Sequence, residues 1–294
     1  MKSLLQELNK KKIDFVLNPN FKDFSYLRLN HQLFLSIKPK SIKKLIKAIK
    51  LLKKYKIAYA FIGNGTNSFI IDNNIALISL MYLKKINHAC LKKIKISSNQ
   101  IMSYLSSFYS KKRIKTFIGG TLIPGTIGAG IIGNAGIKNI TVAKYLQSII
   151  VLDLNDLKIK RIKKKDISFK YRFSNLNDKI ILKLSFFKSK DNDVLLFYDS
   201  LAQYRKNQPK ERSLGSTFKN HSLISAGALI DSLGLKGIKY QNLEISTLHA
   251  NFIISKGNAF SIDFYFLILL IKICVYFQTG ILLEQEVKKL KKYL

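Results

Sequence analysis

The stretch GGTLIPGTIGAGIIGNAG, residues 119–136, holds seven of the 15 glycines of this 294-residue chain. Glycine costs backbone entropy on folding, and it is needed where φ is positive or where another group lies against the main chain. A mobile linker would be polar and rich in serine, whereas these glycines alternate with Leu, Ile and Ala. The stretch therefore predicts a buried backbone segment that another group approaches closely.

A pattern of strands and helices leads into this segment. Strands are predicted at 34–39, 57–63 and 75–80, and helices at 41–56 and 99–110. The helix at 41–56 carries apolar residues on one face and lysines on the other, with Ser41 as its N-cap. The strand at 57–63 ends in the turn GNGTN, at the carboxyl end where α/β sheets bind ligands.

The second half of the chain predicts further elements and a domain boundary. Residues 145–154 are predicted as a helix edge leading into a strand, and 178–190 as a strand with a polar break. Helices are predicted at 195–209, stopping before Pro209, and at 225–237, closed by Gly234 or Gly237. The domains are predicted as 1–185 and 186–294. The apolar run 264–277 contains Lys272 and is too short to span a membrane, so it predicts a core-facing helix.

The formal net charge of +34 suggests nucleic-acid binding, but the type of cation argues against it. Only six of the 51 basic residues are arginine, the residue that reads base edges and forks onto phosphate. Lysine, Ile, Asn, Phe and Tyr are all abundant and Trp is absent, as AT-rich codons would produce. Mutational drift therefore explains the charge. Cys90 and Cys274 have no paired spacing, so we expect reduced thiols in the cytoplasm and no metal site.

Two glycine turns and three short motifs could carry chemistry. Successive backbone N–H groups at 63–67 and 119–136 suit a pyrophosphate, although the usual dinucleotide and P-loop fingerprints are absent. From the residues alone, a nucleotide or flavin site and an ordinary pair of turns both remain open. YRFS (171–174) reads alone as a surface turn, and GSTFKN (215–220) as a Ser/Thr turn. Glu284 and Glu286 read as surface carboxylates on one face of a strand.

Together, however, the motifs resemble one family in order from about residue 20 to residue 287. They are AFIGNGTN (60–67), LIPGTIGAGIIGNAG (122–136), YRFS, GSTFKN, GLKG (234–237) with HANFII (249–254), and GILLEQEV (280–287). This set resembles the UDP-N-acetylenolpyruvoylglucosamine reductases, the MurB family, in its shorter type without an extra substrate-closing loop.

The resemblance implies a fold of mixed α+β and α/β type. It combines a vanillyl-alcohol-oxidase-type FAD domain of two α/β lobes with a C-terminal α/β substrate domain. FAD would be bound non-covalently, since no histidine lies in the glycine-rich segment. The implied cofactor-binding residues are Gly63, Asn64, Gly65, Thr66, Asn67, Pro124, Gly125, Thr126, Gly128, Asn134, Ala135 and Gly136.

The resemblance also implies a reaction. NADPH would reduce FAD, and UDP-N-acetylenolpyruvoylglucosamine would become UDP-N-acetylmuramate for peptidoglycan synthesis, and so for cell shape and division. Arg172 would grip the substrate carboxylate, Glu286 would donate to the developing enolate, and Ser216 would give the proton. The implied substrate-binding residues are Tyr171, Lys219 and Asn220. We expect a cytoplasmic monomer that binds no membrane and no specific nucleic acid.

The sequence departs from the family pattern in the flavin wall. Leu122 stands where a glycine is usual, Ala129 replaces another glycine, and Gly133 replaces a bulkier residue. A Gly-Gly pair is missing near RLNH (28–31), and SSN (97–99) stands in place of a glycine-rich turn. Two other functions stay open: another FAD-dependent oxidoreductase of this fold, and a basic nucleic-acid-binding protein.

Overall fold

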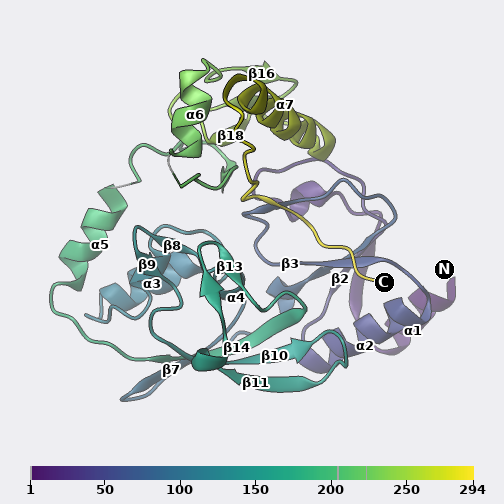
Figure 1. The fold of residues 1–294 in the computed structure, drawn as a ribbon. Coiled ribbons are helices and arrows are strands. Elements are labelled where there is room, and N and C mark those ends of the chain that lie inside the picture. The colour runs from purple at the N-terminus through teal and green to yellow at the C-terminus, as the bar shows by residue number, and fades with distance from the viewer. Residues whose placement is uncertain (1, 204, 223) are drawn as a thin grey trace. The chain divides into compact units, whose positions relative to one another are not determined.

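The computed structural model describes residues 2–203, 205–222 and 224–294, and its chain divides into two compact units. Unit 1 comprises Met1–Pro39, Lys47–Leu80 and Asn207–Leu294, and unit 2 comprises Lys40–Ile46 and Met81–Lys206. Neither unit is continuous in sequence. Unit 1 contains both ends of the chain, and unit 2 includes the short segment Lys40–Ile46 besides Met81–Lys206 (Figure 1). The predicted domains 1–185 and 186–294 were defined by expected function and not by compactness. This division of the chain therefore remains a proposal.

A four-stranded sheet forms the first part of unit 1. Its strands, in spatial order, are β1 (Asp14–Leu17), β2 (Leu35–Lys38), β5 (Ala76–Ser79) and β3 (Tyr59–Ile62). The last three are parallel, and β1 is antiparallel to β2. Helix α1 (Lys2–Lys10) precedes the sheet, and α2 (Ile42–Lys54) connects β2 to β3. The Ser41 hydroxyl accepts the N–H of Lys44 at 3.2 Å, so the predicted N-cap of α2 is confirmed.

The C-terminal part of unit 1 is an antiparallel sheet with two helices. The strands are β15 (Ser213–Ser216), β18 (Phe252–Ser255), β17 (Leu243–Ile245) and β16 (Lys239–Tyr240), in this order. Helix α6 (Ala226–Ser232) and the long α7 (Ser261–Thr279) lie with them in Figure 1. One core joins both parts of the unit, because Phe69 of the first part stacks edge-on against Phe264 of α7. A short parallel pair, β4 (Ser68–Phe69) with β19 (Lys288–Lys289), also links the two parts.

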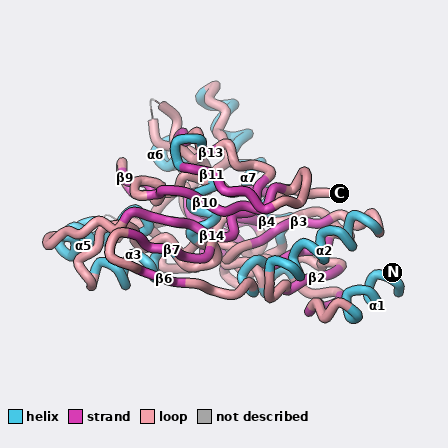
Figure 2. Tube along the Cα trace, turned by 90° about the horizontal axis from the view of Figure 1, so that it is seen from below, coloured by secondary structure: helices cyan, strands magenta, loops and turns pink. Residues whose placement is uncertain are grey.

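Unit 2 contains a five-stranded antiparallel sheet. Its order is β11 (Ile159–Lys163), β10 (Leu146–Asp153), β14 (Lys179–Phe187), β7 (Lys93–Ser97) and β6 (Asn87–Ala89), as Figure 2 shows. The helices are α3 (Met102–Ser110), α4 (Ile127–Ile132) and α5 (Val194–Gln203). Two small hairpins complete the unit: β8 (Gly136–Ile137) with β9 (Ile140–Thr141), and β12 (Phe169–Lys170) with β13 (Phe173–Ser174). Its core joins Ile149 and Val151 of β10 to Leu105 of α3 and Phe186 of β14.

Most of the predicted elements are confirmed, and four predictions are wrong. The helix predicted to stop before Pro209 ends at Gln203, and residues 205–207 form a turn, while residue 204 lies outside the described residues. Residues 146–153 are entirely strand, because Ile149 and Val151 alternate into the core and no helix edge precedes them. Helix α3 starts three residues later than predicted, since 99–101 are held by backbone contacts to the glycine-rich segment. Glu284 and Glu286 lie outside any strand, in a segment that makes one isolated bridge at Gln285.

Candidate functional site

Two motifs of unit 1 that are far apart in sequence are paired through their backbones. The N–H of Glu286 donates to the carbonyl of Thr217 at 2.8 Å, and the N–H of Lys219 donates to the carbonyl of Glu284 at 2.8 Å. An antiparallel bridge between Phe218 and Gln285 lies between these two bonds. The structure therefore places the segments that carry Ser216 and Glu286 side by side.

The turn GNGTN joins the same cluster. The amide of Asn67 donates to the carbonyl of Glu286 at 3.3 Å, and the carbonyl of Asn67 accepts the N–H of Lys288 at 3.0 Å. Gly65 has φ of +60°, and a Cβ there would lie 1.8 Å from the carbonyl oxygen of Phe24. Only glycine fits this turn, which explains the glycine there without any ligand.

A buried asparagine that the sequence analysis did not select holds GSTFKN in place. Asn251 accepts the N–H of Phe218 at 2.9 Å with its side-chain oxygen, and its amide donates to the carbonyl of Phe218 at 2.8 Å. Its own carbonyl accepts the N–H of Thr217 at 2.8 Å. The Asn251 side chain thus makes the two hydrogen bonds to the backbone of Phe218 that a neighbouring β-strand would otherwise make. Asn251 lies within the motif HANFII, which the sequence analysis quoted. Nothing in the motif's sequence indicates that this asparagine binds the backbone of Phe218.

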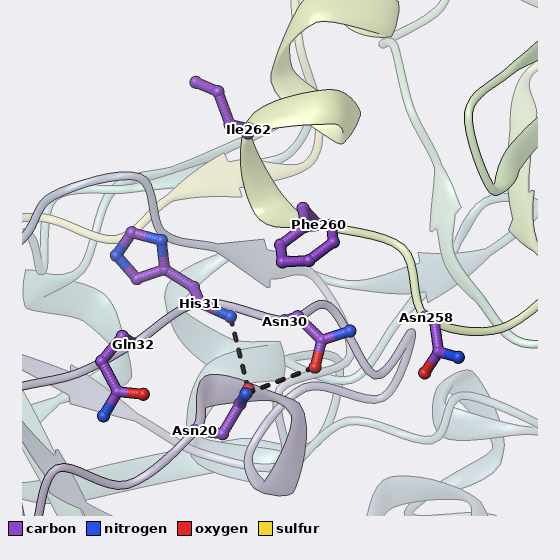
Figure 3. Close-up of a pocket in the computed structure, with 7 residues that line it drawn as sticks. All are labelled: Asn20, Asn30, His31, Gln32, Asn258, Phe260 and Ile262. Carbon is purple, nitrogen blue, oxygen red and sulfur yellow. Dashed lines mark hydrogen bonds between the residues drawn. The ribbon is translucent and has the colours of Figure 1, made fainter.

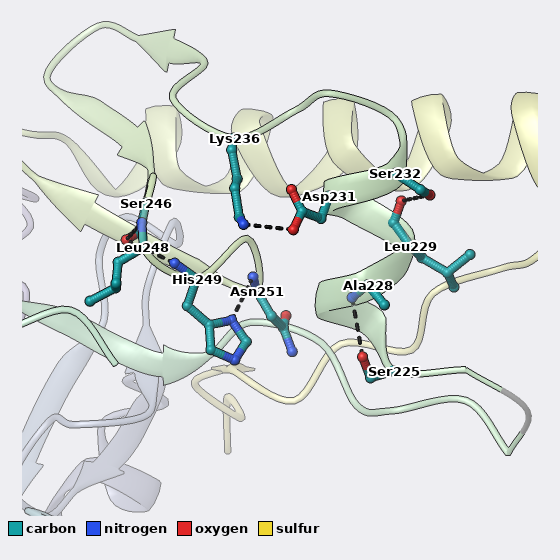
Figure 4. A network of polar contacts seen from close by, with 10 residues as sticks. All are labelled: Ser225, Ala228, Leu229, Asp231, Ser232, Lys236, Ser246, Leu248, His249 and Asn251. Atoms are coloured by element: carbon teal, nitrogen blue, oxygen red, sulfur yellow. Dashed lines mark hydrogen bonds and ion pairs between the residues drawn. The ribbon is translucent and has the colours of Figure 1, made fainter. Parts of the chain in front are cut away.

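His249 supports this asparagine. Its Nδ1 lies 3.2 Å from the backbone N–H of Asn251 and accepts it, which requires an unprotonated Nδ1 (Figure 4). Burial lowers the pKa of His249, and the nearby charge of Lys236 lowers it further. Lys236 itself pairs with Asp231 at 2.6 Å. The neutral imidazole is therefore the form on which this part of the site depends.

Two of the residues predicted to bind substrate, Lys219 and Asn220, have partners within unit 1. Lys219 forms an ion pair with Glu284, and Asn220 accepts the N–H of Ala226 at 3.2 Å. Lys288 is a further cation of this cluster that the sequence analysis missed. The pKa of Lys288 is lowered mainly by its burial and, to a smaller extent, by the charge of Lys219, while the charge of Glu286 raises it. The cluster around Glu286 thus has more than one cation that an anionic ligand could engage.

In unit 2, the glycine-rich segment packs against residues 98–100. The N–H of Gly128 donates to the carbonyl of Ser98 at 2.9 Å, and the N–H of Ile127 donates to that of Gln100 at 2.8 Å. Thr126 caps α4 by accepting the N–H of Ala129 at 3.3 Å. Ser98, within the SSN departure from the family pattern, and the neighbouring Gln100 thus support the glycine-rich segment.

Part of the glycine content is explained by the chain's own packing. A Cβ on Gly136 would lie 2.3 Å from the carbonyl oxygen of Ile140, and one on Gly119 would lie 2.7 Å from Thr141 backbone atoms. A Cβ on Gly128 would lie 2.7 Å from Cβ of Ser98. The group predicted to approach these glycines is therefore, at these three positions, another part of the protein.

One buried acceptor in this segment fits a ligand. The Oδ1 of Asn134 is buried and accepts no hydrogen bond from the described residues, while its amide donates to the carbonyl of Lys170 at 2.9 Å. An unsatisfied buried carbonyl costs about 1–3 kcal/mol unless a donor reaches it. The hydroxyls and ring N–H of FAD are such donors, so Asn134 fits the expected cofactor.

The YRFS motif is tied to the same segment. Tyr171 and Arg172 form the tip of the β12–β13 hairpin, and Arg172 has φ of 54°. The guanidinium of Arg172 lies 5.2 Å from the ring centre of Tyr171. At the base of the hairpin, the Ser174 hydroxyl donates to the carbonyl of Ile132 at 2.7 Å. Unit 2 therefore holds Arg172 beside the predicted cofactor segment.

A second arginine lies near Arg172 and was also missed. Arg205 donates to the carbonyl of Leu122 at 3.3 Å. Burial lowers the pKa of Arg205, and the charge of Arg172 lowers it further. Two neighbouring guanidinium groups favour an anion between or beside them. The scarcity of arginine in the sequence could have pointed to Arg205 as a candidate site residue, just as it did to Arg172.

A cavity of about 490 Å³ lies elsewhere in unit 1, and Figure 3 shows it. It is lined by Asn20, Asn30, His31, Gln32, Asn258, Phe260 and Ile262. Asn30 and His31 belong to RLNH, near which the family pattern has Gly-Gly, and the His31 ring lies 3.1 Å from the carbonyl of Asp72. None of the predicted site residues lines this cavity.

Comparisons with known proteins find matches to two parts of the chain. Residues 35–162 match the model of the FAD binding domain, and residues 208–290 match that of the UDP-N-acetylenolpyruvoylglucosamine reductase, C-terminal domain. The UDP-N-acetylenolpyruvoylglucosamine reductase of Prochlorococcus marinus (strain NATL2A) is 36% identical over 262 residues, which cover 85% of this chain and 89% of that protein. The enzyme of the same name from Clostridioides difficile is 29% identical, with 97% and 96% covered.

A solved structure has the same fold. The crystal structure of UDP-N-acetylenolpyruvylglucosamine reductase from Thermus caldophilus matches with a TM-score of 0.78 and 24% identity. The match covers 94% of this chain and 98% of that one. The mixed fold with an FAD-binding domain, predicted from the resemblance, is thereby confirmed.

Proposed function

The chain belongs to the UDP-N-acetylenolpyruvoylglucosamine reductase family, and from this premise we propose that it makes UDP-N-acetylmuramate. The proposed reaction reduces the enol-ether double bond of UDP-N-acetylenolpyruvoylglucosamine, with NADPH as the reductant. It supplies a precursor of peptidoglycan, in the cytoplasm. The observation that carries this proposal is the backbone pairing of the segments of Ser216 and Glu286, through Thr217.

When bound, FAD would supply the hydride-transfer chemistry that links NADPH to the substrate double bond. Asn134 and the backbone of 124–128 and 134–136 would hold this cofactor, together with the turn 63–67. The orphaned Oδ1 of Asn134 supports this assignment. We propose non-covalent binding, since the segment 119–136 contains no histidine to form a tether.

The reaction needs a positive group and a proton donor. Hydride addition at one carbon leaves negative charge on the neighbouring carbon and on the carboxylate attached to it. Arg172 would grip that carboxylate, because its planar fork suits a bidentate contact. The scarcity of arginine in this chain supports a specific role for it.

Proton transfer falls to unit 1. Ser216 would give its hydroxyl proton to the carbanionic carbon, which is basic enough to accept from a weak acid. Glu286, in its protonated form, would donate a hydrogen bond to the developing enolate. Lys219, Asn220 and Tyr171 would bind the rest of the substrate. The double bond thus gains one hydride and one proton.

A direct assay tests this proposal. The purified chain, loaded with FAD, is mixed with NADPH and the enolpyruvyl substrate, and NADPH loss is followed with mass analysis of the product. We expect NADPH to disappear in step with a product heavier than the substrate by two hydrogen atoms. NADPH loss without that product would indicate another flavin-dependent oxidoreductase.

A further inference from the structure

Lys219 and Glu284 form an ion pair that the register of two segments sets up. The N–H of Lys219 donates to the carbonyl of Glu284 at 2.8 Å, and the adjacent residues Phe218 and Gln285 form an antiparallel bridge. Residues directly opposite each other in an antiparallel pair bring their side chains close together on one side. The ion pair therefore follows from the backbone pairing of the site and is not a chance contact between two long side chains.

The two partners differ in exposure. The side chain of Lys219 is 21% exposed, whereas that of Glu284 is 71% exposed. An ion pair with one partner so exposed contributes little to stability, and a carboxylate that leaves the lysine returns to water. The ammonium group of Lys219 is largely covered, so it depends more on an anionic partner. Glu284 is thus the partner that can leave, and Lys219 is the one that stays.

A second lysine adds to the need for an anion at this place. Burial lowers the pKa of Lys288, and the charge of Lys219 lowers it further, so the two ammonium groups lie near each other. Like charges at short range repel, and nearby carboxylates offset part of this repulsion. Glu284 pairs with Lys219, and the charge of Glu286 raises the pKa of Lys288. The site therefore holds anions of its own where an anionic substrate would bind.

The substrate of the proposed reaction carries a diphosphate, which offers an ammonium group more charge and more acceptor oxygens than one carboxylate does. We propose that Glu284 is a displaceable counter-ion, which holds Lys219 in position until a phosphate oxygen of the substrate takes its place. This inference rests on the proposed function. The exchange makes and breaks no covalent bond, since Glu284 turns to water as the phosphate binds. A ligand without phosphate cannot take the lysine from Glu284, so the pair selects phosphorylated ligands.

A purely structural role for the ion pair makes the opposite prediction. If Glu284 only fixed the two segments together, its loss would loosen Lys219 and weaken substrate binding. A counter-ion competes with the substrate for the same ammonium group, so its loss strengthens substrate binding. The sign of the change in affinity therefore separates the two roles.

Glu284→Gln removes the charge of the side chain and keeps its size. The FAD-loaded chain is titrated with the enolpyruvyl substrate in a calorimeter, without NADPH, and flavin absorbance reports that each variant is folded. We expect the dissociation constant of Glu284→Gln to be about two- to five-fold lower than that of the wild type, since the substrate no longer displaces an exposed ion pair. A dissociation constant equal to that of the wild type, or higher, overturns the proposal.

The matched control is Glu7→Gln. Glu7 also pairs with a lysine, Lys54 at 2.6 Å, and its replacement removes the same negative charge from the chain. It lies in α1, outside the segments that carry the proposed site. We expect this variant to bind the substrate as the wild type does. Equal strengthening in Glu7→Gln and Glu284→Gln would be a general effect of net charge and overturns the proposal.

Lys219→Met completes a double-mutant cycle with Glu284→Gln. Lys219→Met should bind the substrate more weakly, and Glu284→Gln should bring no gain in this background, because there is no ammonium group left to compete for. A gain of the same size in both backgrounds overturns the proposal. A wild-type chain that binds the substrate but forms no reduced product with NADPH contradicts the proposed function alone, whereas one that does not bind the substrate contradicts both.

Discussion

The backbone N–H of Glu286 donates to the carbonyl of Thr217 at 2.8 Å and joins two segments that lie about seventy residues apart in sequence. Asn67, from the turn GNGTN, donates to the carbonyl of Glu286 in the same place. Unit 1 thereby gathers the proposed proton donor, the proposed acid and one predicted cofactor turn. The predictions below test what holds these segments and what they do.

The first prediction concerns the clamp on GSTFKN. Asn251→Ala leaves the buried N–H and C=O of Phe218 without partners, at about 1–3 kcal/mol for each group. We expect reduced stability in urea unfolding and slower oxidation of reduced flavin by substrate, with flavin reduction by NADPH unchanged. The matched control is Asn242→Ala, whose amide makes only an exposed 3.4 Å contact with Asn258. If both variants behave as wild type, Asn251 does not position Ser216.

The second prediction concerns pH. Protonation of His249 removes the acceptor at Nδ1, and burial lowers the pKa of His249 below the unfolded value near 6.5. The unfolded state therefore binds the proton first as pH falls, and this contribution to stability is present above about pH 6.5 and is lost below it. Comparing unfolding at pH 8 and pH 5.5, His249→Gln should flatten the pH dependence. Substitution of the exposed His88 by Gln should leave it unchanged.

The third prediction concerns a strained residue in the flavin wall. Leu122, where the family usually has glycine, has φ of 55°, a conformation that costs an L-residue roughly 1–2 kcal/mol. Leu122→Ala and Leu122→Gly both remove the side chain, but only Gly removes the strain. We expect the Gly variant to exceed the Ala variant by about 1 kcal/mol in free energy of unfolding. An Ala variant of equal or greater stability would show that no strain is stored there.

The fourth prediction compares two glycines of the opening stretch. Gly136→Ala places a Cβ 2.3 Å from the carbonyl oxygen of Ile140, so the hairpin must open at a cost of about 1–3 kcal/mol. Gly133→Ala meets only an ordinary 3.5 Å contact with Ala129 and should be neutral or stabilising by roughly 0.4–1 kcal/mol. Thermal unfolding and FAD titration measure both variants. Similar losses of stability in the two variants would contradict this account, because the contact with Ile140 exists only at Gly136.

Local patterns predicted the parts of the fold that depend on near neighbours. The cap at Ser41 follows from helix chemistry, and β2, β3 and β5 follow from short apolar runs. The conformation of 146–153 was not predictable in the same way, because Ile149 and Val151 become strand by packing across the unit 2 sheet.

The site depends on contacts between distant segments, which a single sequence does not display. The resemblance selected Ser216 and Glu286, and the structure shows how their segments meet. Asn251 and Arg205 escaped notice because their importance comes from partners far along the chain. Gly136 was assigned to the cofactor, although the neighbouring hairpin already requires a glycine there.

The central claim, that Ser216 gives the proton to the substrate, is tested most directly by separating the two half-reactions in Ser216→Ala. Flavin reduction by NADPH should stay near the wild-type rate, because it needs no proton from this hydroxyl. Oxidation of the reduced flavin by the enolpyruvyl substrate should slow by ~10²–10⁴-fold, the usual worth of general acid catalysis. Ser216→Cys should recover part of that rate. Equal slowing of both half-reactions, or of neither, would contradict the account.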